Sequence, residues 1–96
     1  MLESGIQNKI IKALRKRNAV VNKTISMSKS GWPDIVGCYR GRFIGIEVKR
    51  PGKKPTPLQQ FKIDELKSAE ACVGAATCVV EALALLDSID EQLSSS

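Results

Sequence analysis

The first 17 residues show the hydrophobic periodicity of an amphipathic helix. Apolar side chains recur every three or four positions and fall on one arc of about 120°, with the lysines outside it. The arc contains Leu2, Ile6, Ile10, Ala13 and Leu14. We therefore predict a helix from Leu2 to about Arg17 that packs its apolar side on a core.

Glu3 lies within this apolar arc. A carboxylate on the core side of a helix is costly unless it is paired or bound to a metal. Two other interpretations remain open. Glu3 is a first-turn acid that the helix dipole favours, or it lies just outside a helix that Ser4 and Gln7 cap.

Three short segments that follow have the alternation and β-branched content of strands. They cover residues 19–27, where the strand is irregular, 34–39 and 43–49. The second and third are joined by a three-residue hairpin signal, Arg40-Gly41-Arg42. In the last strand, Glu47 and Lys49 point to one side and the isoleucines point to the other.

A second helix begins with a strong capping signal. Thr56 is the expected N-cap, Pro57 the first helical residue, and Gln59 the third residue after the cap. The expected apolar face of this helix consists of Leu58, Phe61, Leu66 and Ala69.

A buried strand at 76–80 and a helix at 82–92 complete the expected order. The sequence thus predicts one α/β domain over residues 1–93, with a mixed sheet flanked by helices and an extra C-terminal helix. The serine-rich residues 94–96 are expected to be a disordered tail.

The composition of the chain excludes several classes of catalytic and metal site. The 96 residues contain three cysteines without Cys-x-x-Cys spacing and no histidine. The absence of histidine excludes Ser-His-Asp and Cys-His nucleophiles and the usual zinc sites. With neither a signal peptide nor a long apolar run, we expect a cytoplasmic protein with reduced thiols and no contact with a membrane.

Charge is distributed unevenly along the chain. Residues 1–57 carry 13 Lys and Arg against 3 Asp and Glu, whereas residues 58–96 carry 2 against 7. A basic region of this density favours a polyanion such as nucleic acid, although a solubilising basic face is an alternative. The three acids of the basic part are Glu3, Asp34 and Glu47, and they need an explanation because carboxylates repel phosphates.

These acids suggest a metal site. Glu47 and Lys49 are two positions apart on one strand, which brings them within about 7 Å on the same side, and a neighbouring strand brings Asp34 close. Two carboxylates so near repel each other unless a cation lies between them. Oxygen ligands favour Mg²⁺ or Mn²⁺. The alternative is a charged surface hairpin with paired side chains.

The motifs around these residues resemble those of a known family. Gly31-Trp32-Pro33-Asp34 is followed, 13 positions after Asp34, by Glu47-Val48-Lys49 and a Pro- and Gly-containing basic loop. This arrangement resembles the PD-(D/E)xK nuclease signature, and more closely its VRR-NUC (virus-type replication-repair nuclease) branch. The resemblance extends over about residues 3–85 and includes the Thr-Pro-x-Gln helix start. It implies a restriction-endonuclease-like αβββαβ core.

The resemblance also implies roles for individual residues. Asp34 and Glu47 would bind the metal together with the carbonyl of Val48, and Glu3 would reach it directly or through water. Lys49 would be the catalytic lysine. Gln59 would point toward the site, although its capping role explains it equally well, and the adjacent Gln60 is an alternative in register.

The implied function is a stand-alone Mg²⁺-dependent deoxyribonuclease, in which Mn²⁺ can replace Mg²⁺ and no small-molecule cofactor is needed. By the same resemblance we expect a homodimer that acts on branched DNA such as a four-way (Holliday) junction, in a bacterial or phage-infected cell. The acidic, apolar C-terminal region is the better candidate for the dimer surface. The alternatives are a non-catalytic nucleic-acid-binding module and a nuclease subunit of a larger complex.

A basic rim would hold the phosphates of the DNA. Its expected members are Lys9, Lys12, Arg15, Lys16, Arg40, Arg42, Arg50, Lys53 and Lys54. Contacts of this kind supply affinity and strong salt dependence but no choice of base sequence.

Overall fold

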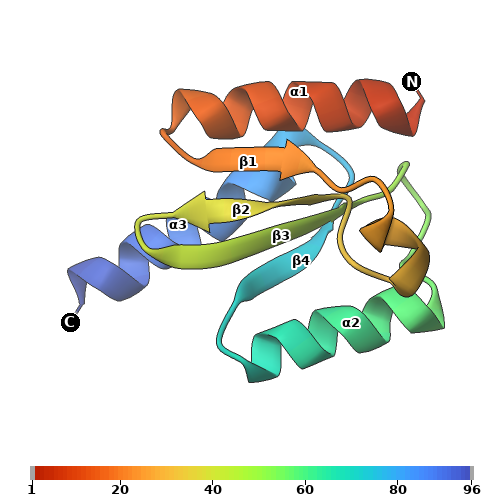
Figure 1. The fold of residues 1–96 in the computed structure, drawn as a ribbon. Helices are drawn as coiled ribbons and strands as arrows, with labels where there is room; N and C mark the ends of the chain where they lie inside the picture. The colour runs from red at the N-terminus through yellow and green to blue at the C-terminus, as the bar shows by residue number, and fades with distance from the viewer. Residues whose placement is uncertain (1, 96) are drawn as a thin grey trace.

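The computed structural model describes residues 2–95 and confirms the predicted class of fold (Figure 1). Its elements in chain order are α1 (Glu3–Lys16), β1 (Val20–Lys23), the 3-10 helix η1 (Met27–Ser30), β2 (Ile35–Tyr39), β3 (Arg42–Val48), α2 (Pro57–Ser68), β4 (Cys72–Ala76) and α3 (Val79–Ser94). No helix within residues 2–95 is long and apolar enough to cross a membrane.

The four strands form one mixed sheet in the order β1-β2-β3-β4. The first three strands are antiparallel neighbours, and β4 lies parallel to β3 because α2 connects them as a crossover. Tyr39 pairs with Arg42, so the hairpin between β2 and β3 has two turn residues, one fewer than predicted.

The main core lies between the sheet and the pair of helices α1 and α3. Ile44, Ile46 and Val48 of β3 are at most 1% exposed and pack with Ile10 and Leu86 from these helices. The other face of the sheet is covered by α2, seen below the sheet in Figure 1. The alternation along β3 therefore sends its aliphatic side chains to one face and Glu47 to the other.

Two predicted strands were wrong in part. The last strand is Cys72–Ala76 instead of 76–80, because Glu81 accepts hydrogen bonds from the backbone N–H and the hydroxyl of Thr77 (2.6 Å each) and so starts α3 at Val79. The first strand ends at Lys23. The chain then leaves the sheet for η1, so residues 24–27 are not a strand.

The predicted apolar face of α2 was also wrong. Leu58 and Phe61 are 53% and 62% exposed, and Ile63 is the side chain of α2 that is buried. The predicted start of this helix is confirmed, because Thr56 and Gln59 form the full capping box.

The predicted disordered tail began at Ser94. The structure instead places Ser94 in the last turn of α3 and Ser95 at its C-cap, where the Ser95 N–H donates to the carbonyl of Glu91 (3.2 Å). Ser96 lies outside the described residues.

Candidate active site

The segment before β2 fixes the position of Asp34. Gly31 has a φ of +83°, and a Cβ there would lie 2.7 Å from the carbonyl oxygen of Leu58. Only glycine therefore combines this backbone conformation with such close packing on α2. Pro33 is buried and covers Gly45 of β3, where an added Cβ would lie 3.0 Å from the proline ring. The Gly-x-Pro part of the motif thus packs the segment against α2 and β3.

Thr24 holds the same segment from the other side. Its hydroxyl donates to the carbonyl of Pro33 (2.7 Å), and its backbone N–H donates to the carbonyl of Asp34 (2.8 Å). Thr24 could not be identified from the sequence, because its partners lie about ten residues away and no local pattern marks it. We describe Thr24 as a positioning residue for Asp34.

Asp34 lies opposite Glu47, as the expected pairing of their two strands predicted. Ile35 pairs with Ile46 in the antiparallel ladder, so the next position brings the two acidic residues together. The carboxylate of Asp34 accepts a hydrogen bond from the backbone N–H of Val48 (2.8 Å). Asp34 is therefore fixed against the strand that carries Glu47 and Lys49.

Within residues 2–95, Glu47 is the one charged residue that is buried, with 1% of its surface exposed. Its Oε2 atom is buried and has no hydrogen-bond partner. Burial raises the pKa of Glu47 to about 8, and repulsion from Asp34 and Glu3 acts in the same direction, while Lys49 opposes it. A buried carboxylate oxygen without a partner is costly. The site therefore stabilises either a proton or a cation at this oxygen.

Lys49 supplies the positive charge nearest to Glu47. Its Nζ lies 3.9 Å from Oε1 of Glu47, and its side chain is only 13% exposed. The backbone N–H of Lys49 donates to the carbonyl of Ala76 (3.0 Å), which holds the lysine at the end of the parallel ladder. The ammonium group is thus held beside the carboxylates, at the distance of a loose ion pair.

Glu3 lies in the first turn of α1 and is half-buried. The helix begins at this residue with Leu2 as its N-cap, so the interpretation in which Ser4 and Gln7 cap the helix was wrong. Glu3 adds to the repulsion that Glu47 experiences. Within residues 2–95, however, no group of three Asp, Glu, Cys or His side chains is close enough together to hold a metal ion. Glu3 therefore lies outside the immediate pair formed by Asp34 and Glu47.

Gln59 and Gln60 have other partners in this structure. Oε1 of Gln59 accepts the backbone N–H of Thr56 (2.9 Å) and completes the capping box of α2. Gln60 donates to Asp64 one turn further along the helix (2.9 Å). The structure thus supports the capping role of Gln59 and does not bring either glutamine into the cluster of Asp34, Glu47 and Lys49.

The donor set of the cluster fits a hard cation. Asp34 and Glu47 offer carboxylate oxygens, and Oε2 of Glu47 is an acceptor with no partner. Oxygen donors of this kind match Mg²⁺ or Mn²⁺. A cation would also relieve the burial and the repulsion that raise the pKa of Glu47.

Two arginines of the predicted basic rim bind α3. Arg40 forms an ion pair with Asp90 (2.8 Å). Arg17, which lies outside the predicted rim, bonds both Asp87 and Asp90 (2.9 Å each). Arg42 donates to the side chain of Gln92 (3.2 Å). The two arginines at the hairpin tip therefore serve to dock α3, which the sequence could not show because their partners lie about 50 residues away.

Comparisons with known proteins agree with this geometry. A family model described as "VRR-NUC domain" matches residues 1–81. A phage protein named "Putative nuclease p44", from Acyrthosiphon pisum secondary endosymbiont phage 1, is 36% identical over 58 residues. That match covers 59% of this chain and 62% of the relative, so it spans less than two thirds of the relative's length.

The fold is also found in a solved structure described as "VRR_NUC domain". That structure has a TM-score of 0.74 to this chain, with 23% identity, and the match covers 88% of this chain and 94% of the other. This likeness establishes the fold, and the family match covers most of the sequence with the Asp34, Glu47 and Lys49 cluster inside it. The chain belongs to the VRR-NUC family.

Proposed function

We propose that this chain is a Mg²⁺-dependent endonuclease that hydrolyses DNA phosphodiester bonds. The observation that carries the proposal is the buried, unpartnered Oε2 of Glu47, opposite Asp34 and beside Lys49. The name of the phage relative supports a nuclease, and the excess of basic residues in the first 57 positions supports a polyanionic substrate. This family member would act in the cytoplasm of a bacterium or of a phage-infected cell.

Each residue of the cluster has a proposed role. Asp34 and Glu47 would hold the cation together with the carbonyl of Val48, and Glu3 would reach it through a water molecule. When bound, Mg²⁺ supplies positive charge that activates a water and neutralises phosphate oxygens. Mn²⁺ would serve in its place. Lys49 would orient the attacking water and stabilise the negative charge that develops on the phosphate.

A non-catalytic DNA-binding module is the second candidate. Such a module would share the basic residues but would have no use for a pair of facing carboxylates with one buried oxygen unpaired, because that pair repels phosphate. The burial of Glu47 therefore favours the enzyme. A nuclease subunit that needs a larger complex has the same site and differs only in the activity of the isolated chain.

We further propose that the preferred substrate is branched DNA, such as a four-way junction, and that the enzyme is a homodimer. One site cuts one strand, and two symmetric cuts need two copies related by a two-fold axis. Both proposals follow from the family resemblance and from the small size of the domain.

The first test is a cleavage assay on labelled four-way junction, linear duplex and single-stranded DNA. We expect junction cleavage in Mg²⁺ or Mn²⁺, none in EDTA, and none with Asp34→Ala in any buffer. Cleavage of duplex or single strands alone would retain the nuclease and reject the junction preference. Tight binding without cleavage of any DNA would support the binding module or a subunit that lacks its partner.

We propose a dimer surface other than α3. Ala82, Leu86 and Ile89 of α3 are buried in its own core, and its aspartates bond Arg17 and Arg40. On the sheet face beside α2, by contrast, Val20, Cys38 and Phe43 are exposed.

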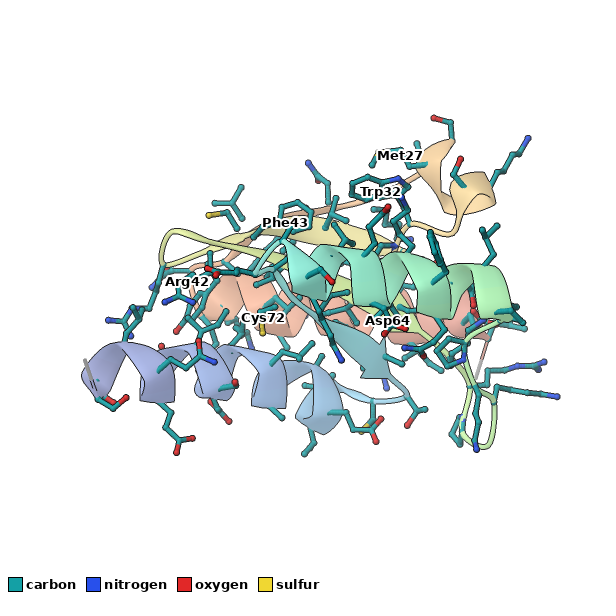
Figure 2. All side chains as sticks on the ribbon, turned by 90° about the horizontal axis from the view of Figure 1, so that it is seen from below. Met27, Trp32, Arg42, Phe43, Asp64 and Cys72 are labelled. Atoms are coloured by element: carbon teal, nitrogen blue, oxygen red, sulfur yellow. The ribbon has the colours of Figure 1, made fainter. Side chains whose placement is uncertain are left out.

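Register makes these three residues cross-strand neighbours, because Val20 pairs with Cys38 and Cys38 with Phe43. Figure 2 views this face with α2 in front and labels Phe43. The row is apolar and continuous over three strands, and we propose it as the contact with a second copy.

The oligomer is tested by size-exclusion chromatography with light scattering. We expect a mass of twice 10.4 kDa for the natural chain. The Val20→Ser, Phe43→Ser double variant should be monomeric, because it removes the apolar contact. Val80→Ser, at an exposed valine of α3 (76% exposed), is the control and should remain dimeric. A monomeric natural chain would reject the homodimer. Loss of the dimer in the Val80 variant would indicate that α3 forms the contact instead.

A further inference from the structure

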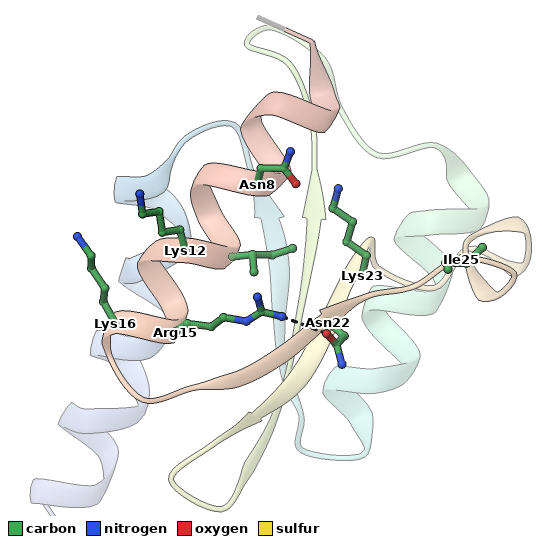
Figure 3. A pocket seen from close by; sticks show the side chains of 8 residues that line it. Asn8, Lys12, Arg15, Lys16, Asn22, Lys23 and Ile25 are labelled. Atoms are coloured by element: carbon green, nitrogen blue, oxygen red, sulfur yellow. Dashed lines mark hydrogen bonds between the residues drawn. The ribbon is translucent and has the colours of Figure 1, made fainter.

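A groove of about 920 Å³ lies between α1 and β1. Its polar lining consists of Asn8, Lys12, Arg15 and Lys16 from α1 and of Asn22 and Lys23 from β1, and Ile11 and Ile25 contribute apolar surface. Figure 3 shows Arg15 reaching from the helix toward Asn22 of the strand. The groove therefore gathers four positive charges and two amide groups, and no acidic residue lines it.

The charges of this groove are not compensated. Within residues 2–95, no ion pair involves Lys12, Arg15, Lys16 or Lys23. Arg15 bonds only uncharged acceptors, the carbonyl of Val21 (2.9 Å) and the side chain of Asn22 (3.1 Å). These bonds hold the guanidinium in place while its charge stays available. Arg17 and Arg40 differ in this respect, because Asp87 and Asp90 of α3 neutralise them.

The groove leads toward the candidate active site. Lys23 at its strand wall pairs with Ile35, the residue after Asp34. The next residue along, Thr24, donates its N–H to the carbonyl of Asp34. The helix wall runs from Lys16 back to Asn8, a distance of about 12 Å at 1.5 Å per residue.

We propose that this groove binds the sugar–phosphate backbone of the DNA on one side of the scissile bond. Lysine and arginine would neutralise successive phosphates, and the two asparagine amides can donate to phosphate oxygens without adding charge. A length of about 12 Å corresponds to about three to four base pairs at 3.4 Å each. The inference rests on the proposed nuclease function and names the path of its substrate.

The test measures DNA binding without cleavage. Each protein carries Asp34→Asn and is titrated in EDTA with a labelled 20-base-pair duplex and a four-way junction at several salt concentrations. The groove variant is Lys12→Gln, Lys16→Gln, Lys23→Gln. We expect its affinity to fall about tenfold or more at 0.1 M salt, and the slope of log K against log salt to become shallower by about 2 to 3, since each lost phosphate contact contributes about 0.7 to 0.9.

The matched control removes three lysines that lie outside the groove and outside the predicted basic rim: Lys29→Gln, Lys62→Gln, Lys67→Gln. Lys29 lies in η1, and Lys62 and Lys67 lie on α2. The control should retain most of the affinity and of the salt slope, and circular dichroism should show that both variants are folded. Equal losses in both variants, or no loss in the groove variant, would overturn the proposal. If the groove variant alone loses binding but the natural chain never cleaves DNA, the groove is supported as a DNA-binding site and the nuclease function is rejected.

Discussion

Replacing Lys49 by Met is expected to lower the rate of DNA cleavage by about 100- to 1000-fold, the usual loss when one preorganised electrostatic group is removed from a site. Methionine keeps most of the apolar stem of this side chain, which is only 13% exposed, so the fold should be retained. The loss should appear in single-turnover cleavage of the junction at saturating Mg²⁺. Cleavage at the natural rate would remove Lys49 from the mechanism.

Metal binding separates this role from a structural one. Asp34 and Glu47 remain in the Lys49→Met variant, so Mg²⁺ should still bind and still raise the melting temperature. Lys67→Met, at an exposed lysine of α2, makes the same change of charge away from the site and should cleave normally. If Lys49→Met lost Mg²⁺ binding as completely as Asp34→Ala, its effect on cleavage would be indirect.

The parts of the site that could be predicted from the sequence are those fixed by local structure. The short hairpin sets the register of β2 and β3, so the spacing from Asp34 to Glu47 already implies that the two residues face each other. The strand alternation likewise separates Glu47 from the core-facing isoleucines. These interactions depend on neighbours within about 14 residues, which is why the pattern was sufficient.

The parts that could not be predicted depend on distant partners. Arg40 was predicted to be a phosphate ligand because Asp90 lies 50 residues away and forms its ion pair only in the folded chain. The shift of β4 to Cys72–Ala76 depends on its pairing with β3 and on the Thr77–Glu81 cap. The exposure of Phe61 depends on how α2 is placed on the sheet, which its own sequence does not show. The groove between α1 and β1 likewise forms only when the two elements pack.

The pH dependence of stability is expected to reveal the burial of Glu47. In the metal-free folded protein this carboxyl keeps its proton up to about pH 8, whereas the unfolded chain loses it near the ordinary value of 4.5. Between these values the folded state binds more protons than the unfolded state, so the free energy of unfolding must fall as the pH rises. The slope is at most about 1.4 kcal/mol per pH unit for one proton. Urea denaturation in EDTA at pH values from 5 to 9 measures it.

Glu47→Gln isolates this contribution, because the amide has nearly the same shape and does not ionise. The variant should lose the downward slope and be more stable than the natural chain at pH 8 in EDTA, by a few kcal/mol at most. Added Mg²⁺ should stabilise the natural chain increasingly as the pH rises, since binding displaces the proton, and should leave the variant unchanged. Glu91→Gln, at an exposed position of α3, makes the same change of charge and should behave as the natural chain. A slope that persists in Glu47→Gln would place the titrating group elsewhere, and Mg²⁺ stabilisation of that variant would contradict Glu47 as a ligand.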